Sequence, residues 1–269
     1  MAAEGIEVVL LKLDRARYHN DQAQAIWDQF YSSGVYKFIM RMDERPPYTI
    51  RFLWDLRART EEEQKVLTDL GLIFADFLGN LRSALDHLAW RLVEISGTQP
   101  HNRTSFPAAK TQAAWLTARG REVRGIAPEL VAIIDEVQPY HDAYPERNLL
   151  WVLDEVNNLN KHRVIPATAE SLGTFRLLYT APDGIERKLS NTEPKVRVVN
   201  GEEFIAITAD PLCNNPNVSL LDPDIRYSFE DGLNHDNGWS YTNADLINLV
   251  NSIIGQFEPA FRKQAEAIP

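Results

Sequence analysis

The chain has 269 residues, of which 44% are hydrophobic and 25% are charged. This balance is typical of a folded globular protein and excludes a disordered or fibrous chain. The formal net charge of −10 argues against a protein that coats nucleic acid over its whole surface, because phosphate contacts require clustered lysine and arginine.

Basic residues are nevertheless concentrated in residues 103–124, where Glu122 is the only acid. A local anion-binding site and a solvated loop are both compatible with this stretch. Its basic residues are Arg103, Lys110, Arg119, Arg121 and Arg124.

Cysteine content and hydropathy indicate the compartment. Cys213 is the only cysteine, so no internal disulfide can form, and a reducing environment is expected. The first residues lack a basic stretch followed by a long apolar core, and no later run approaches the roughly 20 apolar residues of a membrane span. We therefore expect a cytoplasmic protein with no membrane partner.

The first predicted elements are a helix and a β-hairpin. Residues 6–31 carry apolar residues at mostly helical spacing. Residues 36–42 and 48–56 alternate between apolar and polar side chains, and the proline-containing stretch between them cannot continue a ladder. These two segments are therefore predicted to pair as a hairpin.

A long helix is predicted next, from Thr60, which is a suitable N-cap, to Gly97. Its apolar residues follow alternating spacings of three and four, which is typical of a helix packed in a bundle. Shorter helices are predicted near 110–118, at 127–137 and at 149–159.

From residue 164 the pattern changes to short β-type runs separated by turns. Asn200-Gly201 lies between two such runs and predicts a tight hairpin turn. Residues 242–264 return to a helical pattern. The predicted fold class is α+β: a helical bundle with a mostly antiparallel β-sheet packed beside it.

Three regions are expected along the chain. Residues 1–57 form an N-terminal helix and hairpin, and residues 58–164 form the helical bundle. Residues 165–269 contribute antiparallel strands and a C-terminal helix that close the same domain.

The stretch 80–90, NLRSALDHLAW, places Arg82 and His87 on the long helix. Each helical residue advances about 100°, so these two side chains lie about 140° apart and cannot pair on one face. The opposite face from the apolar seam has small residues and a tryptophan where a surface helix would be charged. This composition predicts that another backbone approaches the face, which consists of Leu72, Gly79, Ser83, Asp86 and Trp90.

Two interpretations of this helix remain open. In the first, the helix is central, Arg82 pairs with Asp86 four residues later, and His87 is hydrogen-bonded in the interior. In the second, Arg82 and His87 project into a cleft shared with a second copy or a ligand. Arginine would bind phosphate there, and histidine would transfer a proton.

An arginine followed after four residues by a histidine on a bundle helix resembles the motif of the HEPN superfamily. Many of its members are metal-independent endoribonucleases in toxin and antiphage systems. This resemblance implies a homodimer that cleaves RNA without a metal or other cofactor, opposed by an antitoxin of unknown identity. It also implies that His87 is the general acid or base and that Arg82 stabilises the charged phosphorane.

Four segments also resemble a broad group of uncharacterised bacterial proteins: NLRSALDHLAW, the Phe106-Pro107 pair, QPY at 138–140 and NNLNKHR at 157–163. The last segment ends a predicted helix, where basic residues complement the helix dipole. Alternatively, it binds phosphate or base edges in the same cleft as Arg82. The candidate substrate-binding residues are then Asn157, Asn160, Lys161, His162, Arg163 and Trp90.

Two other functions remain open. The first is a non-catalytic binding or structural module whose β region recognises a partner or nucleotide. The second is a metal-binding bundle, because His19, His87 and His162 lie on three different predicted helices and could hold Zn²⁺ or Ni²⁺. That arrangement loosely resembles DinB-like bundles. The sequence has no nucleophile-elbow, phosphate-loop or dinucleotide-binding motif.

Overall fold

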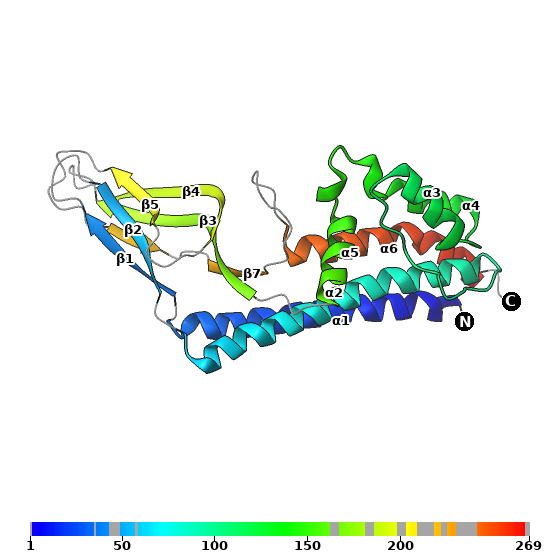
Figure 1. Cartoon of the computed structure of the whole chain (residues 1–269), viewed down its shortest axis with the longest axis horizontal. Helices are drawn as coiled ribbons and strands as arrows, with labels where there is room; N and C mark the ends of the chain where they lie inside the picture. Colours follow the sequence, from blue (N-terminus) through cyan, green and yellow to red (C-terminus); the bar gives the residue numbers. More distant parts are fainter. Residues whose placement is uncertain are drawn as a thin grey trace. The chain divides into compact units, whose positions relative to one another are not determined.

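The chain forms two compact units, each assembled from segments that are far apart in the sequence (Figure 1). We call them the helical unit (residues 1–23, 72–165 and 235–269) and the strand unit (residues 24–71 and 166–234). The predicted region boundaries at residues 57 and 164 stay a prediction. The computed structural model describes residues 2–34, 36–42, 49–56, 59–161, 167–180, 186–197, 203–208, 218–221, 225–229 and 241–266.

The described helices agree with those predicted from apolar spacing. None of them combines the length and apolar character needed to cross a membrane. Two 3₁₀ turns, Pro139–His141 and Pro145–Arg147, precede α5. The α-helices are α1 (Ala2–Ser32), α2 (Glu61–Ile95), α3 (Gln112–Arg121), α4 (Pro128–Glu136), α5 (Leu149–Asn160) and α6 (Asn243–Glu266).

The predicted N-cap of the long helix α2 is confirmed. The Glu63 N–H donates to Thr60 Oγ1 at 3.2 Å, and the Thr60 N–H donates to the Glu63 carboxylate at 2.9 Å. This reciprocal pair satisfies two backbone donors that would otherwise lack a partner at the helix start. Three glutamates in the first turn add a favourable interaction with the helix dipole.

The core of the helical unit is built from apolar helix faces. Leu13 of α1, Leu81 of α2 and Phe257 of α6 are all completely buried. Polar contacts also join α1 to α6, since Arg17 donates to Asn251 and Asn243 donates to Asn20. Among the described residues, the periodic leucines and phenylalanines of these long helices therefore contribute many of the buried apolar side chains.

The strand unit contains two small antiparallel sheets. One has the order β1-β2-β5, and in the other β3 pairs with β4, β6 and β7. The strands are β1 (Tyr36–Met42), β2 (Thr49–Leu56), β3 (Ala167–Thr180), β4 (Glu186–Arg197), β5 (Glu203–Thr208), β6 (Val218–Leu221) and β7 (Ile225–Phe229).

Of the two hairpins predicted from turn chemistry, one is correct and one is wrong. β1 and β2 pair with Met40 opposite Phe52, so their apolar positions share a face as expected. The runs on either side of Asn200-Gly201 do not pair with each other, because β4 pairs with β3 and β5 pairs with β2. The Asn200-Gly201 turn itself lies outside the described residues.

The predicted fold class, α+β with an antiparallel sheet packed beside the bundle, is wrong, because the chain is mostly helical. The buried apolar residues of the described part of the chain lie mostly on helices. The strands form two small sheets that are grouped in a separate unit. Short β-type runs in the sequence predict that a segment forms a strand, but they do not predict which other element the strand packs against.

Gly125, between α3 and α4, has a backbone conformation that favours glycine, with φ +95°. A Cβ atom there would lie 2.6 Å from Thr98 Oγ1. That hydroxyl cannot move freely, because it donates to the Gly125 carbonyl at 2.7 Å and to the Val93 carbonyl at 3.1 Å. Gly125 therefore permits the close approach of the segments around residues 98 and 125.

We predict that Gly125→Ala lowers the free energy of unfolding by roughly 1–3 kcal/mol through backbone strain and the contact with Thr98. Gly120→Ala is the control, since a Cβ at this position in α3 meets nothing within 4 Å. The control should raise stability by up to about 1 kcal/mol, because alanine favours helix. Chemical denaturation measures both, and equal effects would contradict the role given to Gly125.

Candidate functional site

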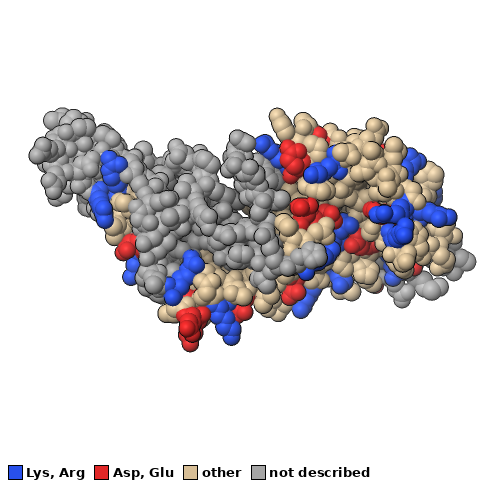
Figure 2. Space-filling view, viewed as in Figure 1, with Lys and Arg blue, Asp and Glu red and all other residues tan. Residues whose placement is uncertain are grey.

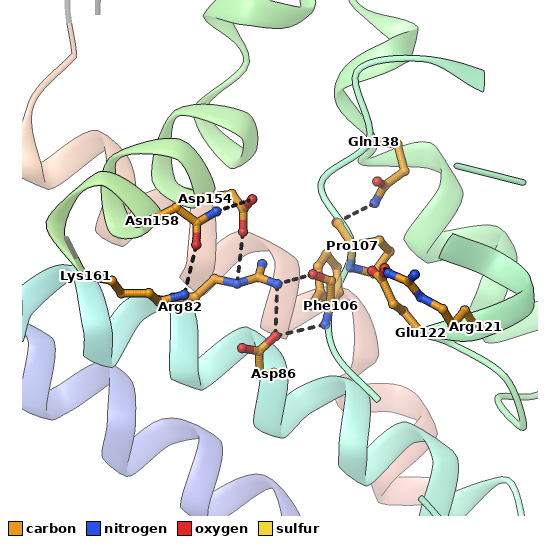
Figure 3. A network of polar contacts seen from close by, with 10 residues as sticks. All are labelled: Arg82, Asp86, Phe106, Pro107, Arg121, Glu122, Gln138, Asp154, Asn158 and Lys161. Atoms are coloured by element: carbon orange, nitrogen blue, oxygen red, sulfur yellow. Dashed lines mark hydrogen bonds and ion pairs between the residues drawn. The ribbon is translucent and has the colours of Figure 1, made fainter. Parts of the chain in front are cut away.

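Arg82 lies at the centre of a polar network in the helical unit (Figure 3). Its Nη2 donates to the Phe106 carbonyl at 2.5 Å and lies 3.0 Å from Asp86 Oδ1. Its Nε lies 3.3 Å from Asp154 Oδ1, and its side chain is only 12% exposed. One guanidinium group thus joins α2, the loop that precedes α3, and α5.

The Arg82–Asp86 pair binds both backbone groups of Phe106. The Phe106 N–H donates to Asp86 Oδ1 at 3.0 Å, while its carbonyl accepts from Arg82. The residue is completely buried, and buried backbone groups require partners. The predicted ion pair between Arg82 and Asp86 is confirmed, and it also holds the loop against α2.

Gln138 holds the same loop from a second side. Its Oε1 accepts from the Ala109 N–H at 3.0 Å, and its Nε2 donates to the Pro107 carbonyl at 3.1 Å. The Tyr140 N–H donates to the Ala109 carbonyl at 3.0 Å. The Phe106-Pro107 and QPY segments therefore meet, and the backbone of the loop is hydrogen-bonded at successive positions.

One face of α5 extends the network. Asn158 Nδ2 donates to Asp154 Oδ2 at 3.2 Å, and Lys161 Nζ donates to Asn158 Oδ1 at 2.9 Å. The spacings of four and three place these three side chains on the same side of the helix. Asp154 is thereby held in position for its ion pair with Arg82.

The charges of the network balance, with two carboxylates near two cations. Burial raises the pKa of the Asp86 carboxyl above its usual range. Arg82, the Phe106 N–H and Lys161 act in the opposite direction, while the charge of Asp154 raises this pKa further. The negative charges of the network are therefore compensated by its own cations.

The contacts of Arg82 limit what this residue can bind. Its Nε and Nη2 are engaged by carboxylates and a carbonyl, and its Nη1 is buried without a hydrogen-bond partner among the described residues. Arginine recognises phosphate through pairs of N–H groups on its planar fork. Arg82 could bind a phosphate in this way only by giving up Asp86, Asp154 or Phe106.

His87 lies in a different environment. Burial lowers the pKa of its imidazole below the ordinary 6.5, and the charges of Lys12 and Arg91 lower it further, against the effect of Asp86. The imidazole is therefore mostly neutral at neutral pH. Within the described part of the chain it has no hydrogen bond or ion pair, so the predicted interior hydrogen bond is not found there. The structure does not bring His87 together with Arg82.

Four of the six candidate substrate-binding residues lie within the described part of the chain. Lys161 joins the network through Asn158, whereas Asn157 is 5% exposed and its side chain makes no hydrogen bond to a described member of the network. Asn160 is half-buried, and Trp90 is 40% exposed on α2. Their assignment to substrate binding stays a prediction.

Sequence reasoning missed several members of the network. Asp154 and Asn158 could have been found from their spacing relative to Lys161, which is helical. Phe106 and Gln138 lie in motif segments, but nothing in the sequence shows that Phe106 meets α2 or that Gln138 meets the loop around Phe106.

The three-histidine metal site stays a prediction. His162 and Arg163 lie outside the described residues. Within the described ranges, no three His, Cys, Asp or Glu side chains are grouped so as to hold a metal ion. His19 is buried, and its Nδ1 has no hydrogen-bond partner among the residues described.

The face of α2 opposite its apolar seam is open at Leu72, Gly79 and Trp90, whereas Asp86 contacts the loop around Phe106. A Cβ atom added at Gly79 would meet nothing within 4 Å, and Leu72 and Trp90 are 47% and 40% exposed. The Phe106 N–H donates to Asp86 on this face, so the predicted approach of another backbone is confirmed at Asp86. At Gly79 no other described segment packs closely against the helix.

Comparison with known proteins identifies no relative of this chain. No family model, no curated protein and no solved structure matches the chain. The resemblance to the HEPN superfamily stays a prediction.

We predict that Arg82→Met lowers the free energy of unfolding by about 3 kcal/mol, because it leaves Asp86, Asp154 and the Phe106 carbonyl without their cation. Arg262→Met is the matched control, since the Arg262–Glu258 pair is exposed and should contribute between about 0 and 1 kcal/mol. Urea denaturation compares the two. Similar small losses in both variants would show that the network does not stabilise the fold.

The lowered pKa of His87 gives a pH-dependent prediction. Below pH 6.5 the unfolded chain binds a proton at His87 more readily than the folded chain does, so protonation favours unfolding. The stability from neutral His87 is present above this pH and is lost on acidification towards the folded pKa. His87→Gln should therefore lose less stability than the wild type between about pH 7.5 and about pH 5.5. Parallel curves of unfolding free energy against pH would contradict this.

Proposed function

We propose that the helical unit is a non-catalytic binding module, in which Arg82 and Asp86 stabilise the fold and do not act on a substrate. The observation that supports this is the engagement of the Arg82 guanidinium by Asp86, Asp154 and the Phe106 carbonyl. Recognition of a partner is then carried out by surfaces outside this network.

The free-energy cost of breaking the network favours a structural role for Arg82. To stabilise a phosphorane, an arginine must direct donors at the developing negative charge. If Arg82 turned towards a phosphate, it would leave Asp154 without its cation and the buried Phe106 carbonyl without a donor. Breaking such a partly buried ion pair is costly, because the remaining charge is not solvated.

A second candidate is the HEPN-like endoribonuclease, and the state of His87 favours it. A half-buried, mostly neutral imidazole without a partner among the described residues is suited to accept a proton. In this alternative, the base is available although Arg82 must exchange partners before it can bind a phosphate.

The open positions of this α2 face, Leu72, Gly79 and Trp90, also favour the homodimer that this second candidate requires. Leu72 and Trp90 lie equally far along the helix on either side of Leu81, as do Gly79 and Ser83. A two-fold axis that crosses this face at the height of Leu81 along the helix would therefore place Leu72 against the partner's Trp90, with small residues where the helices cross. Such self-complementarity is what an isologous interface requires.

The two candidates are separated by incubating the purified full chain with total RNA in EDTA. The proposed module leaves the RNA intact, because Arg82 is not free to stabilise the reaction. His87→Ala and Arg82→Lys should behave like the wild type in this assay.

Metal-independent cleavage that is lost in both variants, with thermal melts showing that they remain folded, would overturn the proposed module in favour of the ribonuclease. Light scattering of the same samples reports whether the chain is a dimer. A Trp90→Glu variant should then be monomeric if the α2 face is the interface.

A further inference from the structure

Two loop segments of the helical unit lie side by side. The Ser105 N–H donates to the Glu122 carbonyl at 3.3 Å. The Thr98 hydroxyl donates to the Gly125 carbonyl at 2.7 Å, and the Ala127 N–H donates to Ser96 Oγ at 2.9 Å. The segment after α2 therefore runs along the segment that follows α3.

This arrangement brings together arginines that are separated in the sequence. Arg103 lies two residues before Ser105, and Arg121 and Arg124 flank the position of Glu122. With Arg119 in the last turn of α3, they form a group of four exposed side chains. We call Arg103, Arg119, Arg121 and Arg124 the basic surface.

The backbone holds Arg103 in a fixed position. The His101 N–H donates to Thr104 Oγ1 at 3.0 Å, and the Thr104 N–H donates back to the His101 carbonyl at 2.9 Å. The Arg103 N–H donates to His101 Nδ1 at 3.0 Å. Arg103 therefore projects from a turn that is closed by three hydrogen bonds.

The positive charge of the basic surface is mostly uncompensated. Arg121 pairs with Glu122 at 3.0 Å, and Glu122 is the only acid within residues 101–105 and 119–124. Arg103, Arg119 and Arg124 have no ion pair or hydrogen bond from their side chains to any described residue. Figure 2 shows basic side chains gathered at this end of the helical unit, on a protein whose net charge is −10.

The helix dipole explains only part of this surface. Arg119 and Arg121 occupy the last turn of α3, where cations are favourable without any ligand. Arg103 and Arg124 lie outside helices and receive no such stabilisation. Their placement beside the end of α3 increases local repulsion, which a bound anion would relieve.

We propose that the basic surface binds the phosphate backbone of duplex nucleic acid without reading its bases. Arginine forks are suited to phosphate oxygens. Proteins that prefer single strands stack bases on aromatic side chains, and residues 101–105 and 119–124 contain no Phe, Tyr or Trp. The surface thus supplies charge from several directions but no platform for stacking.

The test is the fluorescence anisotropy of a short labelled RNA duplex, a DNA duplex of the same sequence and the corresponding single strand, titrated with the full chain. Binding should have a dissociation constant of about 10⁻⁴–10⁻⁶ M and should weaken steeply between about 50 and about 200 mM salt. RNA and DNA duplexes should bind similarly, because the contacts are to phosphates.

The decisive variant is Arg103→Glu/Arg124→Glu, which removes two unpaired arginines from the surface. It should weaken duplex binding at least tenfold and reduce the slope of log K against log salt by about two. The matched control is Arg15→Glu/Arg17→Glu, which changes the net charge equally on α1. The control should change affinity by less than about threefold, because screening by salt limits distant charges.

Several results would overturn this proposal: no duplex binding at the lowest salt, equal losses in the two variants, or preference for the single strand. Binding to phosphatidylserine vesicles but not to duplexes would assign the surface to a membrane instead. None of these outcomes bears on the role of Arg82, because that residue lies outside the basic surface.

Discussion

The guanidinium group of Arg82 holds three parts of the helical unit together. It binds Asp86 on its own helix, Asp154 on α5, and the carbonyl of Phe106 in the loop before α3. A charge that is 12% exposed needs these partners, and the buried backbone of the loop needs Arg82 in turn. The position of the whole loop follows, because Phe106 is fixed immediately after Ser105, which contacts Glu122.

The contacts of Arg82 with the loop bear on both the proposed binding module and the proposed basic surface, but neither proposal depends on the other. Because the loop is held against α2, the segment that carries Arg103 runs along the segment that carries Arg121 and Arg124. An acidic chain thus acquires one local surface of positive charge. Arg82, which resembles a catalytic residue in the sequence, is engaged by Asp86, Asp154 and the Phe106 carbonyl, while Arg103, Arg119 and Arg124 have no side-chain partner among the described residues.

Local features of the fold were predictable from the sequence, and non-local ones were not. The start of α2 at Thr60 and the β1–β2 hairpin depend on neighbouring residues, so their signals were sufficient. The mostly helical character and the separate pairing of β4 and β5 depend on distant segments, which neither turn chemistry nor periodicity specifies. In the candidate site, the Arg82–Asp86 pair followed from helical spacing, but Asp154 and Phe106 approach from other elements. The four motif segments nonetheless identified most parts of the chain that meet in the network.

The most direct test of whether Arg82 holds α5 to α2 is a double-mutant cycle on the free energy of unfolding, with Arg82→Met and Asp154→Asn made singly and together. Residues that share an ion-pair network are coupled, and we predict a coupling energy of at least about 1 kcal/mol. Strictly additive effects would contradict the account, because they would show that Arg82 does not hold α5 to α2 through Asp154.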